Sequence, residues 1–454
     1  MENTEPSRQP DSIDKTATTI ALLYILLLAV PLRLPYNIQI CDFLAIAMLA
    51  CLVAKIRGTL LNINQQLQPL KVSIFPPTML TAYLATALLA TAFHLHCTFS
   101  EYYEWLVFAF VAFLYHFYAS FLISRKTLAV CGAAIILAVL LSFTYEIIAP
   151  CTGLPSYFCF ISEQMETTEM AFLSRRFAFT LNNPNTFACF YLMPLAMITP
   201  YVFCHDWTQP PFASNDHSAR HSGVKSCWKL LYFPICLILL LPLFSSASKH
   251  GLMSLAIMAS WMKPIFAIDK KSFAKLMLGG VLLVAVVFET TVLCTTFPLK
   301  NSFPFINTLP GMYTVHQATY AKMLLGHPAA IPFGMGIEKV SKEYPKFADH
   351  ALAKSVLERY NAMPSYDNFI TFMDAHNEFL NQMVLFGAIP LAMLLVFLIR
   401  QTKDTKGAGI LLVAAILCCC LWDDLLTKRP IWIALAIITS NNSRIATGQS
   451  KVGD

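Results

Sequence analysis

Long hydrophobic stretches separated by short polar segments recur along the whole chain. A helix that crosses the hydrocarbon core of a bilayer, which is roughly 30 Å thick, needs about 20 mainly apolar residues. Windows of that kind lie at residues 17–36, 39–55, 74–97, 103–124, 127–149, 178–204, 229–246, 250–268, 276–297, 379–399, 408–422 and 425–440. The pattern therefore predicts an all-α polytopic membrane protein with about 12 transmembrane helices.

One segment, residues 298–378, is too polar to cross a membrane, although parts of it have a helical pattern. The stretches VHQATYAKMLL and ADHALAKSVLERY are predicted as helices within this long loop. Loops of such length are uncommon in compact proteins and are usually functional. We therefore expect transmembrane helices 1–9 in residues 1–297, a functional loop in 298–378, and helices 10–12 with a tail in 379–454.

The composition supports this class of protein. Hydrophobic residues make up 57% of the 454 residues and charged residues only 13%, about half the roughly 25% typical of soluble proteins. This balance excludes a soluble enzyme, a disordered protein and a nucleic-acid-binding protein. The net charge of +6 is interpreted as charge on loops at the cytoplasmic side.

The lysine and arginine residues predict the orientation. With the N-terminus in the cytoplasm, most of those in short connections fall on the cytoplasmic side, as the positive-inside rule requires. Residues 150–177 and the long loop 298–378 are then expected outside. Cys151 and Cys159 share the first of these outer loops, where an oxidising compartment would permit a disulfide without requiring one.

Polar side chains gather at the predicted outer ends of the helices, where ionisable groups are costly to keep. They are Arg175, Arg176 and Asn185 before and within the sixth hydrophobic stretch, Lys249 in a tight turn, His316 and Lys322 in the long loop, and His376 with Asn377 where that loop re-enters the membrane. Each alone has a simpler interpretation. The cations can be interfacial anchors, His316 a solvated loop residue, and His376 and the Asn-Pro-Asn run parts of helix starts. Their convergence on one face favours a shared site.

Other chemistries lack their sequence signatures. A helix-borne HExxH, a CxxC pair, a Walker loop and a GxSxG elbow are all absent. Asp423 and Asp424 resemble a metal-binding pair in composition only, because no third ligand stands at a recognisable spacing. The sequence therefore predicts no metal and no cofactor.

Four stretches resemble the O-antigen ligase and polymerase superfamily of bacterial inner-membrane glycosyltransferases. SSASKHGLMSL is similar to the family's outer turn, with Lys249 at the usual arginine position. HQATYAKMLLGHPAAIPFGMG resembles the long-loop helix, with His316 in place of arginine and Tyr320 as the aromatic residue. DAHNEFLNQMVLFGAIP carries a His-Asn pair at His376 and Asn377, and RRFAFTLNNPNTFACF is similar to the Arg and Asn-Pro-Asn helix start. His-Asn-Glu, with a later charged turn and Arg-Pro, favours the ligase branch.

The resemblance implies an O-antigen ligase, a multi-pass protein of the bacterial inner membrane with its active site facing the periplasm. It would transfer a glycan from undecaprenyl pyrophosphate to a sugar hydroxyl of lipid A–core, without a metal or cofactor, among membrane lipids. His376 would accept the acceptor proton. The donor pyrophosphate would be held by cations drawn from Lys249, His316, Arg176, Arg175 and Lys322, and Asn377 and Asn185 would support the site.

Two departures from the family pattern concern the cations. Lys249 keeps the charge but not the two-pronged geometry of arginine, and His316 is a cation only when protonated. Three other functions stay open: an O-antigen polymerase, a protein O-oligosaccharyltransferase, and a transporter of lipid-linked glycans. The first two share the donor and the site, whereas a transporter has no need for a positioned His376.

Overall fold

The computed structural model describes residues 12–30, 39–63, 77–93, 99–121, 123–161, 175–181, 183–204, 224–246, 248, 250–266, 309–359, 366–372, 374–402, 408–421 and 423–446. These residues are mostly helical, which confirms the all-α fold class. A single two-stranded antiparallel hairpin, β1 (Cys159–Ile161) with β2 (Arg175–Phe177), is the sheet structure of this part of the chain.

The helices follow the hydrophobic pattern closely. They are α1 (Ser12–Leu28), η2 (Ile40–Phe43), α2 (Leu44–Ile63), α3 (Thr78–Phe93), α4 (Phe99–Ser120), α5 (Arg125–Thr152), η4 (Phe179–Leu181), α7 (Pro184–Cys204), α8 (Val224–Ser246), α9 (Gly251–Phe266), α11 (Leu309–Gly326), η5 (Pro328–Ala330), α12 (Ile337–Phe347), α13 (His350–Arg359), α14 (Tyr366–Ile370), α15 (Glu378–Leu385), α16 (Ala388–Arg400), α17 (Ala408–Cys419) and α18 (Arg429–Ala446). The predicted stretch 276–297 lies outside the described residues.

Helix α5 is the one described helix that is both long and apolar enough to cross a membrane by length and composition. Its 28 residues extend about 42 Å at 1.5 Å per residue. Parts of α3, α8, α9, α16, α17 and α18 form shorter apolar helices of 10–17 residues. The number of 12 transmembrane helices therefore remains a prediction.

The predicted continuous helix 379–399 is wrong, because the chain breaks between α15 and α16. Gly387 has φ 94°, and a Cβ there would collide with the carbonyl of Pro332. The backbone of the preceding loop fills the break, since Ala388 N donates to Ile331 O at 2.7 Å and Met335 N donates to Val384 O at 2.6 Å. The hydropathy of VLFGAIPLAML runs on without interruption, so the sequence pattern alone conceals this break.

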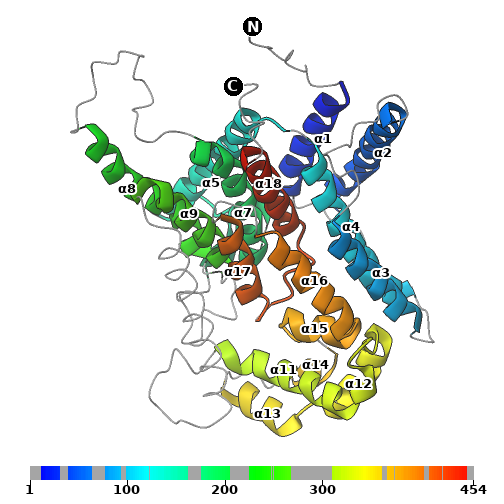
Figure 1. Cartoon of the computed structure of the whole chain (residues 1–454). Coiled ribbons are helices and arrows are strands. Elements are labelled where there is room, and N and C mark those ends of the chain that lie inside the picture. The colour runs from blue at the N-terminus through cyan, green and yellow to red at the C-terminus, as the bar shows by residue number, and fades with distance from the viewer. Residues whose placement is uncertain are drawn as a thin grey trace.

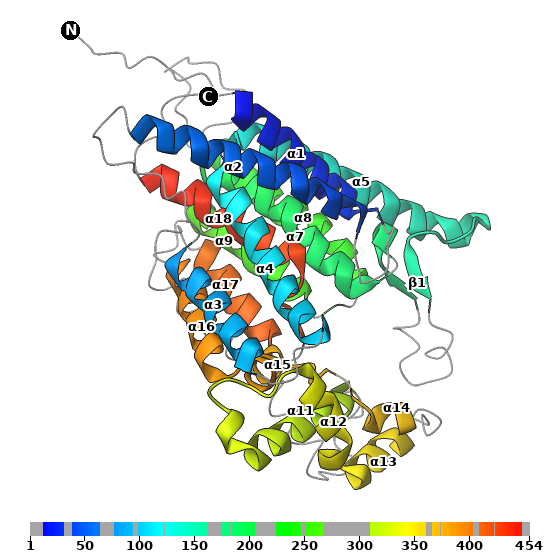
Figure 2. The same cartoon turned by 90° about the vertical axis from the view of Figure 1, so that its right-hand side faces the viewer.

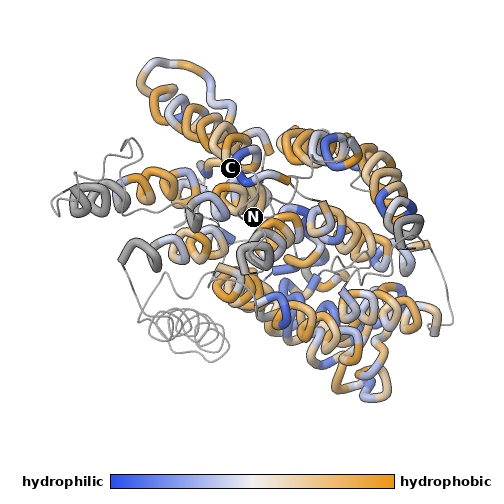
Figure 3. The backbone as a smooth tube through the Cα atoms, turned by 45° about the horizontal axis from the view of Figure 1, so that its top comes forward, coloured by the Kyte–Doolittle hydropathy of each residue, from blue (hydrophilic) through white to orange (hydrophobic). Residues whose placement is uncertain are grey.

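The helices form two parts, which Figures 1 and 2 show from two sides. Helices α1–α9 and α15–α18 surround one large hydrophobic core, whereas α11–α14 lie at the lower end, opposite the start of α1, around smaller clusters of their own. Hydrophobic residues predominate along the helices of the larger part, as the orange colour in Figure 3 shows, and some of their side chains are exposed. Ile46, Val130 and Leu141 are 73%, 64% and 62% exposed, which is typical of a surface covered by lipid or another apolar partner.

The smaller part confirms the two helices expected in the long loop, as α11 and α13. It also contains α12, which the sequence analysis did not predict. This helix buries Val340 and Tyr344 and exposes Lys342 and Lys346 on its other side, the pattern of a helix that lies on a surface. Cys151 and Cys159 are not joined by a disulfide in the structure.

Candidate functional site

The start of α7 brings the first polar residues of the site together. Asn183 Oδ1 accepts hydrogen bonds from Asn185 N at 2.8 Å and Thr186 N at 3.1 Å, and Pro184 is the first helical residue. The Asn-Pro-Asn run is therefore a helix start, since an Asn cap followed by proline suits the first turn. This cap leaves the Asn185 side chain free to make contacts outside the helix.

A hydrogen-bonded chain runs from β2 to the turn between α8 and α9. Arg176 Nε donates to Ser246 O at 2.7 Å, and its Nη2 lies 3.3 Å from Asn185 Oδ1. Ser248 Oγ donates to the same Asn185 oxygen at 2.9 Å. Three segments that are distant in the sequence are thus joined through one amide side chain.

His250 continues this chain to the turn before α18. Its side chain is only 1% exposed, with Nδ1 3.3 Å from Ser248 Oγ and Nε2 2.9 Å from Asp423 Oδ2. A buried carboxylate needs such a partner, because its desolvation is costly. His250 therefore attaches the turn at 423–429 to the start of α9.

That turn holds two cations close to carboxylates. Lys428 Nζ lies 3.5 Å from Asp424 Oδ2, and Arg429 Nη2 lies 2.6 Å from Asp42 Oδ2. Burial, together with the neighbouring carboxylate of Asp423, raises the pKa of Asp424. The carboxylate of Asp424 beside Lys428 favours the charged form of this lysine.

Glu378 links the same turn to α15. Its Oε2 accepts from Leu426 N at 3.1 Å, its Oε1 accepts from Gln382 Nε2 at 2.8 Å, and its own N donates to Cys420 O at 2.7 Å. Burial raises the pKa of this carboxyl group to about 7, against the lowering effect of the hydrogen bond from Gln382. Glu378 is thus held as part of the framework.

His376 stands directly before α15 in a strained backbone conformation. Its φ of 48° lies in the left-handed region, which non-glycine residues rarely adopt. Asn377, and not His376, caps α15, because Asn377 Oδ1 accepts from Leu380 N at 3.2 Å. Gln317 Nε2 reaches both His376 O, at 3.5 Å, and Leu421 O, at 3.3 Å. The surrounding structure therefore holds His376 in place.

His316 lies next to His376, with 5.8 Å between the ring centroids. It is 1% exposed, and its Nδ1 lies 2.6 Å from the Tyr344 hydroxyl. Burial, and then the neighbouring His376, lowers the pKa of His316 to about 4. His316 is consequently neutral near pH 7, which argues against its expected role as a cation for pyrophosphate unless a bound anion raises its pKa.

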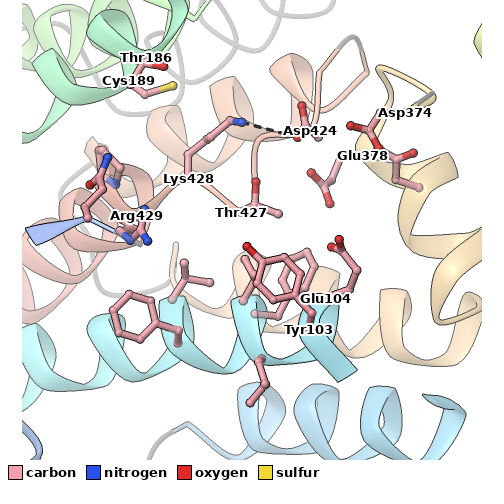
Figure 4. A pocket seen from close by; sticks show the side chains of 18 of the residues that line it. Tyr103, Glu104, Thr186, Cys189, Asp374, Glu378, Asp424, Thr427, Lys428 and Arg429 are labelled. Atoms are coloured by element: carbon pink, nitrogen blue, oxygen red, sulfur yellow. Dashed lines mark ion pairs between the residues drawn. The ribbon is translucent and has the colours of Figure 1, made fainter. Parts of the chain in front are cut away.

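A cavity of about 1120 Å³ opens between α4, α7, α11, α15 and the turn before α18. Figure 4 shows its charged groups on two sides, with Lys428 and Arg429 on one and Glu104, Asp374 and Glu378 on the other. Apolar residues of η2, α2 and α4 line the rest, among them Phe43, Ile46, Phe99, Leu106, Val107 and Phe110. The cavity can therefore take a ligand that is polar at one end and apolar at the other.

The predicted site residues differ in where they lie in the structure. His376, His316, Arg176, Asn185 and Asn377 lie in the hydrogen-bonded region described above. Lys249 and the side chain of Arg175 lie outside the described residues. Lys322 is 49% exposed and pairs with Asp349 at 2.8 Å, so its predicted contact with pyrophosphate has no geometric support. None of Lys322, His376, His316 and Arg176 lines the cavity itself.

The sequence analysis overlooked several residues of the site. His250, Asp423, Lys428, Glu104 and the hydroxyl of Tyr320 were not assigned a role, although the predicted topology places all of them at the same outer end of the helices. That shared depth was the available signal. Among the described residues, no group of His, Cys, Asp and Glu is arranged to hold a metal ion.

No protein-family model, curated protein or solved structure matches this chain. The resemblance of the four sequence stretches therefore has no independent support from relatives. The chemistry of the site has to be derived from its own residues.

Proposed function

We propose that the protein is a membrane glycosyltransferase that moves a glycan from a lipid pyrophosphate to a sugar hydroxyl, most specifically an O-antigen ligase acting on lipid A–core at the periplasmic face. The observation that carries the proposal is that residues from all four family-like stretches, including the His-Asn pair, lie near one another. Arg176, Asn185, Ser248 and His250 form one hydrogen-bonded chain, and His376 is held against α11 next to the cavity-lining turn.

His376 suits the role of general base. A sugar hydroxyl is a poor nucleophile until a positioned base accepts its proton, and histidine titrates near neutral pH. Strained conformations of this kind cost about 1–3 kcal/mol and cluster at active sites. The left-handed φ of His376 therefore supports a function beyond capping, which Asn377 already performs.

The cations support the departure of the leaving group. As the acceptor oxygen bonds to the anomeric carbon of the donor sugar, the bond from that carbon to the pyrophosphate breaks and its electron pair stays on the phosphate oxygen. The proton passes to His376. Fixed positive charge stabilises the pyrophosphate, and Lys428 supplies it within the described cavity while Arg176 lies in the adjoining chain. In the sequence, Lys249 lies between Ser248 and His250, in the turn between α8 and α9.

The apolar surfaces support a lipid-linked donor. Large hydrophobic side chains are exposed on α2 and α5, and Phe43 and Ile46 line the cavity beside them. An isoprenoid chain requires such a surface, because each buried methylene gains roughly 0.8 kcal/mol. A polymerase, a protein O-oligosaccharyltransferase and a transporter of lipid-linked glycans remain the alternatives.

A lipopolysaccharide gel separates these functions. Cells that lack the gene would be complemented with the wild-type protein, His376→Ala or the control His350→Ala, which changes an exposed histidine of α13. We expect core bands without a ladder in the deletion strain, and a ladder restored by the wild type and the control but not by His376→Ala.

Each other outcome has its own meaning. Core carrying a single repeat in the deletion strain would indicate a polymerase. An unchanged ladder would indicate a different acceptor, whereas a lost ladder that His376→Ala restores as fully as the wild type would favour a transporter of lipid-linked glycans. A full ladder with His376→Ala would contradict the proposed general base.

A further inference from the structure

Three polar groups on one side of the cavity have no hydrogen-bond or ion-pair partner within the described part of the chain. They are the carboxylates of Glu104 on α4 and of Asp374 before α15, and the hydroxyl of Tyr320 on α11, and all three residues line the cavity. Tyr320 is 1% exposed, and its ring packs edge-on against Tyr344 with centroids 5.9 Å apart. Burial of its ring contrasts with the lack of a partner for its hydroxyl.

The three residues line the same cavity although they come from three different elements. Burial raises the pKa of the Tyr320 hydroxyl well above its ordinary value, and the charges of Asp374 and Glu104 raise it further. An effect on one hydroxyl from both carboxylates requires all three to lie within Coulombic reach. Figure 4 shows Glu104 and Asp374 on the same side of the cavity, opposite Arg429.

Asp374 is exposed and Glu104 is partly buried, whereas Tyr320 is a buried side chain whose hydroxyl has no partner, and that calls for an explanation. Carboxylates only accept hydrogen bonds, whereas a tyrosine hydroxyl both donates and accepts. A ligand that satisfies this side must therefore donate several hydrogen bonds. Pyrophosphate does not donate them, and the carboxylates on this side disfavour its negative charge.

A sugar ring meets these requirements. Its hydroxyls donate to carboxylates, and its C–H faces pack on aromatic rings, which Tyr103 and Phe372 provide at the same cavity. Position also favours the acceptor over the donor. Asp374 stands two residues before His376, the residue that would receive the acceptor proton, whereas the donor sugar is tied to a pyrophosphate that this side repels.

We propose that Tyr320, Glu104 and Asp374 form a subsite that binds the sugar of the acceptor. This inference rests on the proposed transferase function for the identity of the acceptor. The subsite itself is a sugar-binding site that exists independently of turnover. The cavity is thereby divided into a sugar side and a phosphate side.

Direct binding tests the subsite without requiring catalysis. Core oligosaccharide freed from its lipid would be titrated calorimetrically into the full chain in nanodiscs, with inorganic pyrophosphate as the second probe. We expect Glu104→Gln, Asp374→Asn and Tyr320→Phe each to weaken oligosaccharide binding about ten-fold or more, because each removes a hydrogen bond that involves a charged or buried group. Pyrophosphate binding should be unchanged or tighter.

Matched controls are present on the loop helices. Glu358→Gln on α13 and Asp367→Asn on α14 change exposed carboxylates away from the cavity and should leave both affinities unchanged. Tyr320→Phe removes only one oxygen atom, so it still tests the subsite if a carboxylate variant fails to fold. Wild-type protein that does not bind the oligosaccharide, or three variants that bind it as tightly as the wild type, would overturn the subsite.

Kinetics separates a failure of the subsite from a failure of the proposed function. In a transfer assay the variants should raise the KM for the acceptor and leave the KM for the donor unchanged. Transfer with an unaltered acceptor KM would reject the subsite and keep the transferase. Oligosaccharide binding that depends on Tyr320, in a protein without transfer activity, would keep the subsite and reject the transferase.

Discussion

The two sides of the cavity differ in how their charged groups are satisfied. On the cation side, Arg429 lies 2.6 Å from Asp42 and Lys428 lies 3.5 Å from Asp424. On the carboxylate side, Glu104 and Asp374 have no such partner among the described residues. Buried ion pairs that are complete connect elements of the fold, whereas unsatisfied groups around an open volume are available to a ligand.

The cation side is also the side that is attached to the rest of the helices. Arg429 and Asp42 are 387 residues apart in the sequence and join α18 to η2. His250 and Asp423 join α9 to the same turn. The comparison therefore predicts that variants on this side affect stability and donor binding, while variants on the opposite side affect the acceptor alone.

The largest expected effect is on stability. His250→Ala removes the imidazole that lies 2.9 Å from the Asp423 carboxylate, and removal of one member of a buried pair costs about 3 kcal/mol. Chemical unfolding in detergent would measure this loss against the exposed control His350→Ala. The double variant His250→Ala/Asp423→Ala should lose less than the sum of the two single variants. Additive losses would show that the two side chains are not coupled.

A smaller effect is expected on donor binding. Lys428→Met removes the cation that lines the cavity, so the KM for the lipid-pyrophosphate donor should rise about ten-fold, the effect of one lost charge-assisted hydrogen bond. The KM for the acceptor should not change. Lys354→Met, at an exposed lysine of α13, is the matched control. A rise in the acceptor KM alone would reverse the assignment of the two sides.

The third effect is a change with pH. The pKa of His316 is lowered from 6.5 to about 4 by burial and by His376, so the unfolded chain binds a proton more readily than the folded one. The stability that this residue contributes is therefore present above pH 6.5 and is lost as the pH falls towards 4.

His316→Gln removes this contribution and retains an amide that can hydrogen-bond Tyr344. Between pH 7.5 and pH 5.5 the folding equilibrium constant of the wild type should fall by up to about ten-fold more than that of the variant. Thermal unfolding midpoints measured across this range would give the comparison. Identical pH profiles would mean that the pKa of His316 is the same in the folded and the unfolded protein.

The smallest effect concerns Lys322. Its ion pair with Asp349 is at the surface, with side chains 49% and 32% exposed, and such pairs contribute less than about 1 kcal/mol. Lys322→Ala should leave stability and donor KM close to those of the wild type in the same unfolding and transfer assays. A large rise in the donor KM would instead restore the sequence-based expectation that Lys322 binds pyrophosphate.

The sequence by itself determined the helical elements and several of their ends. Hydrophobic periodicity and capping are local properties, so most of the predicted stretches appear as helices, and the Asn-Pro-Asn run and Asn377 lie at helix starts. A shared membrane depth of His376, His316 and Arg176 stays a prediction from the order of hydrophobic stretches. None of this required knowledge of which helices pack together.

Only the tertiary structure decided which polar groups meet and in what environment. The break at Gly387 depends on a loop that enters from residues 331–336. Burial makes His316 neutral and exposure leaves Lys322 at the surface, although both belong to one helix. The pairing of His250 with Asp423 and the unsatisfied hydroxyl of Tyr320 likewise arise from long-range packing. Packing sets the local dielectric and the available partners, and the chemistry of an ionisable group depends on both.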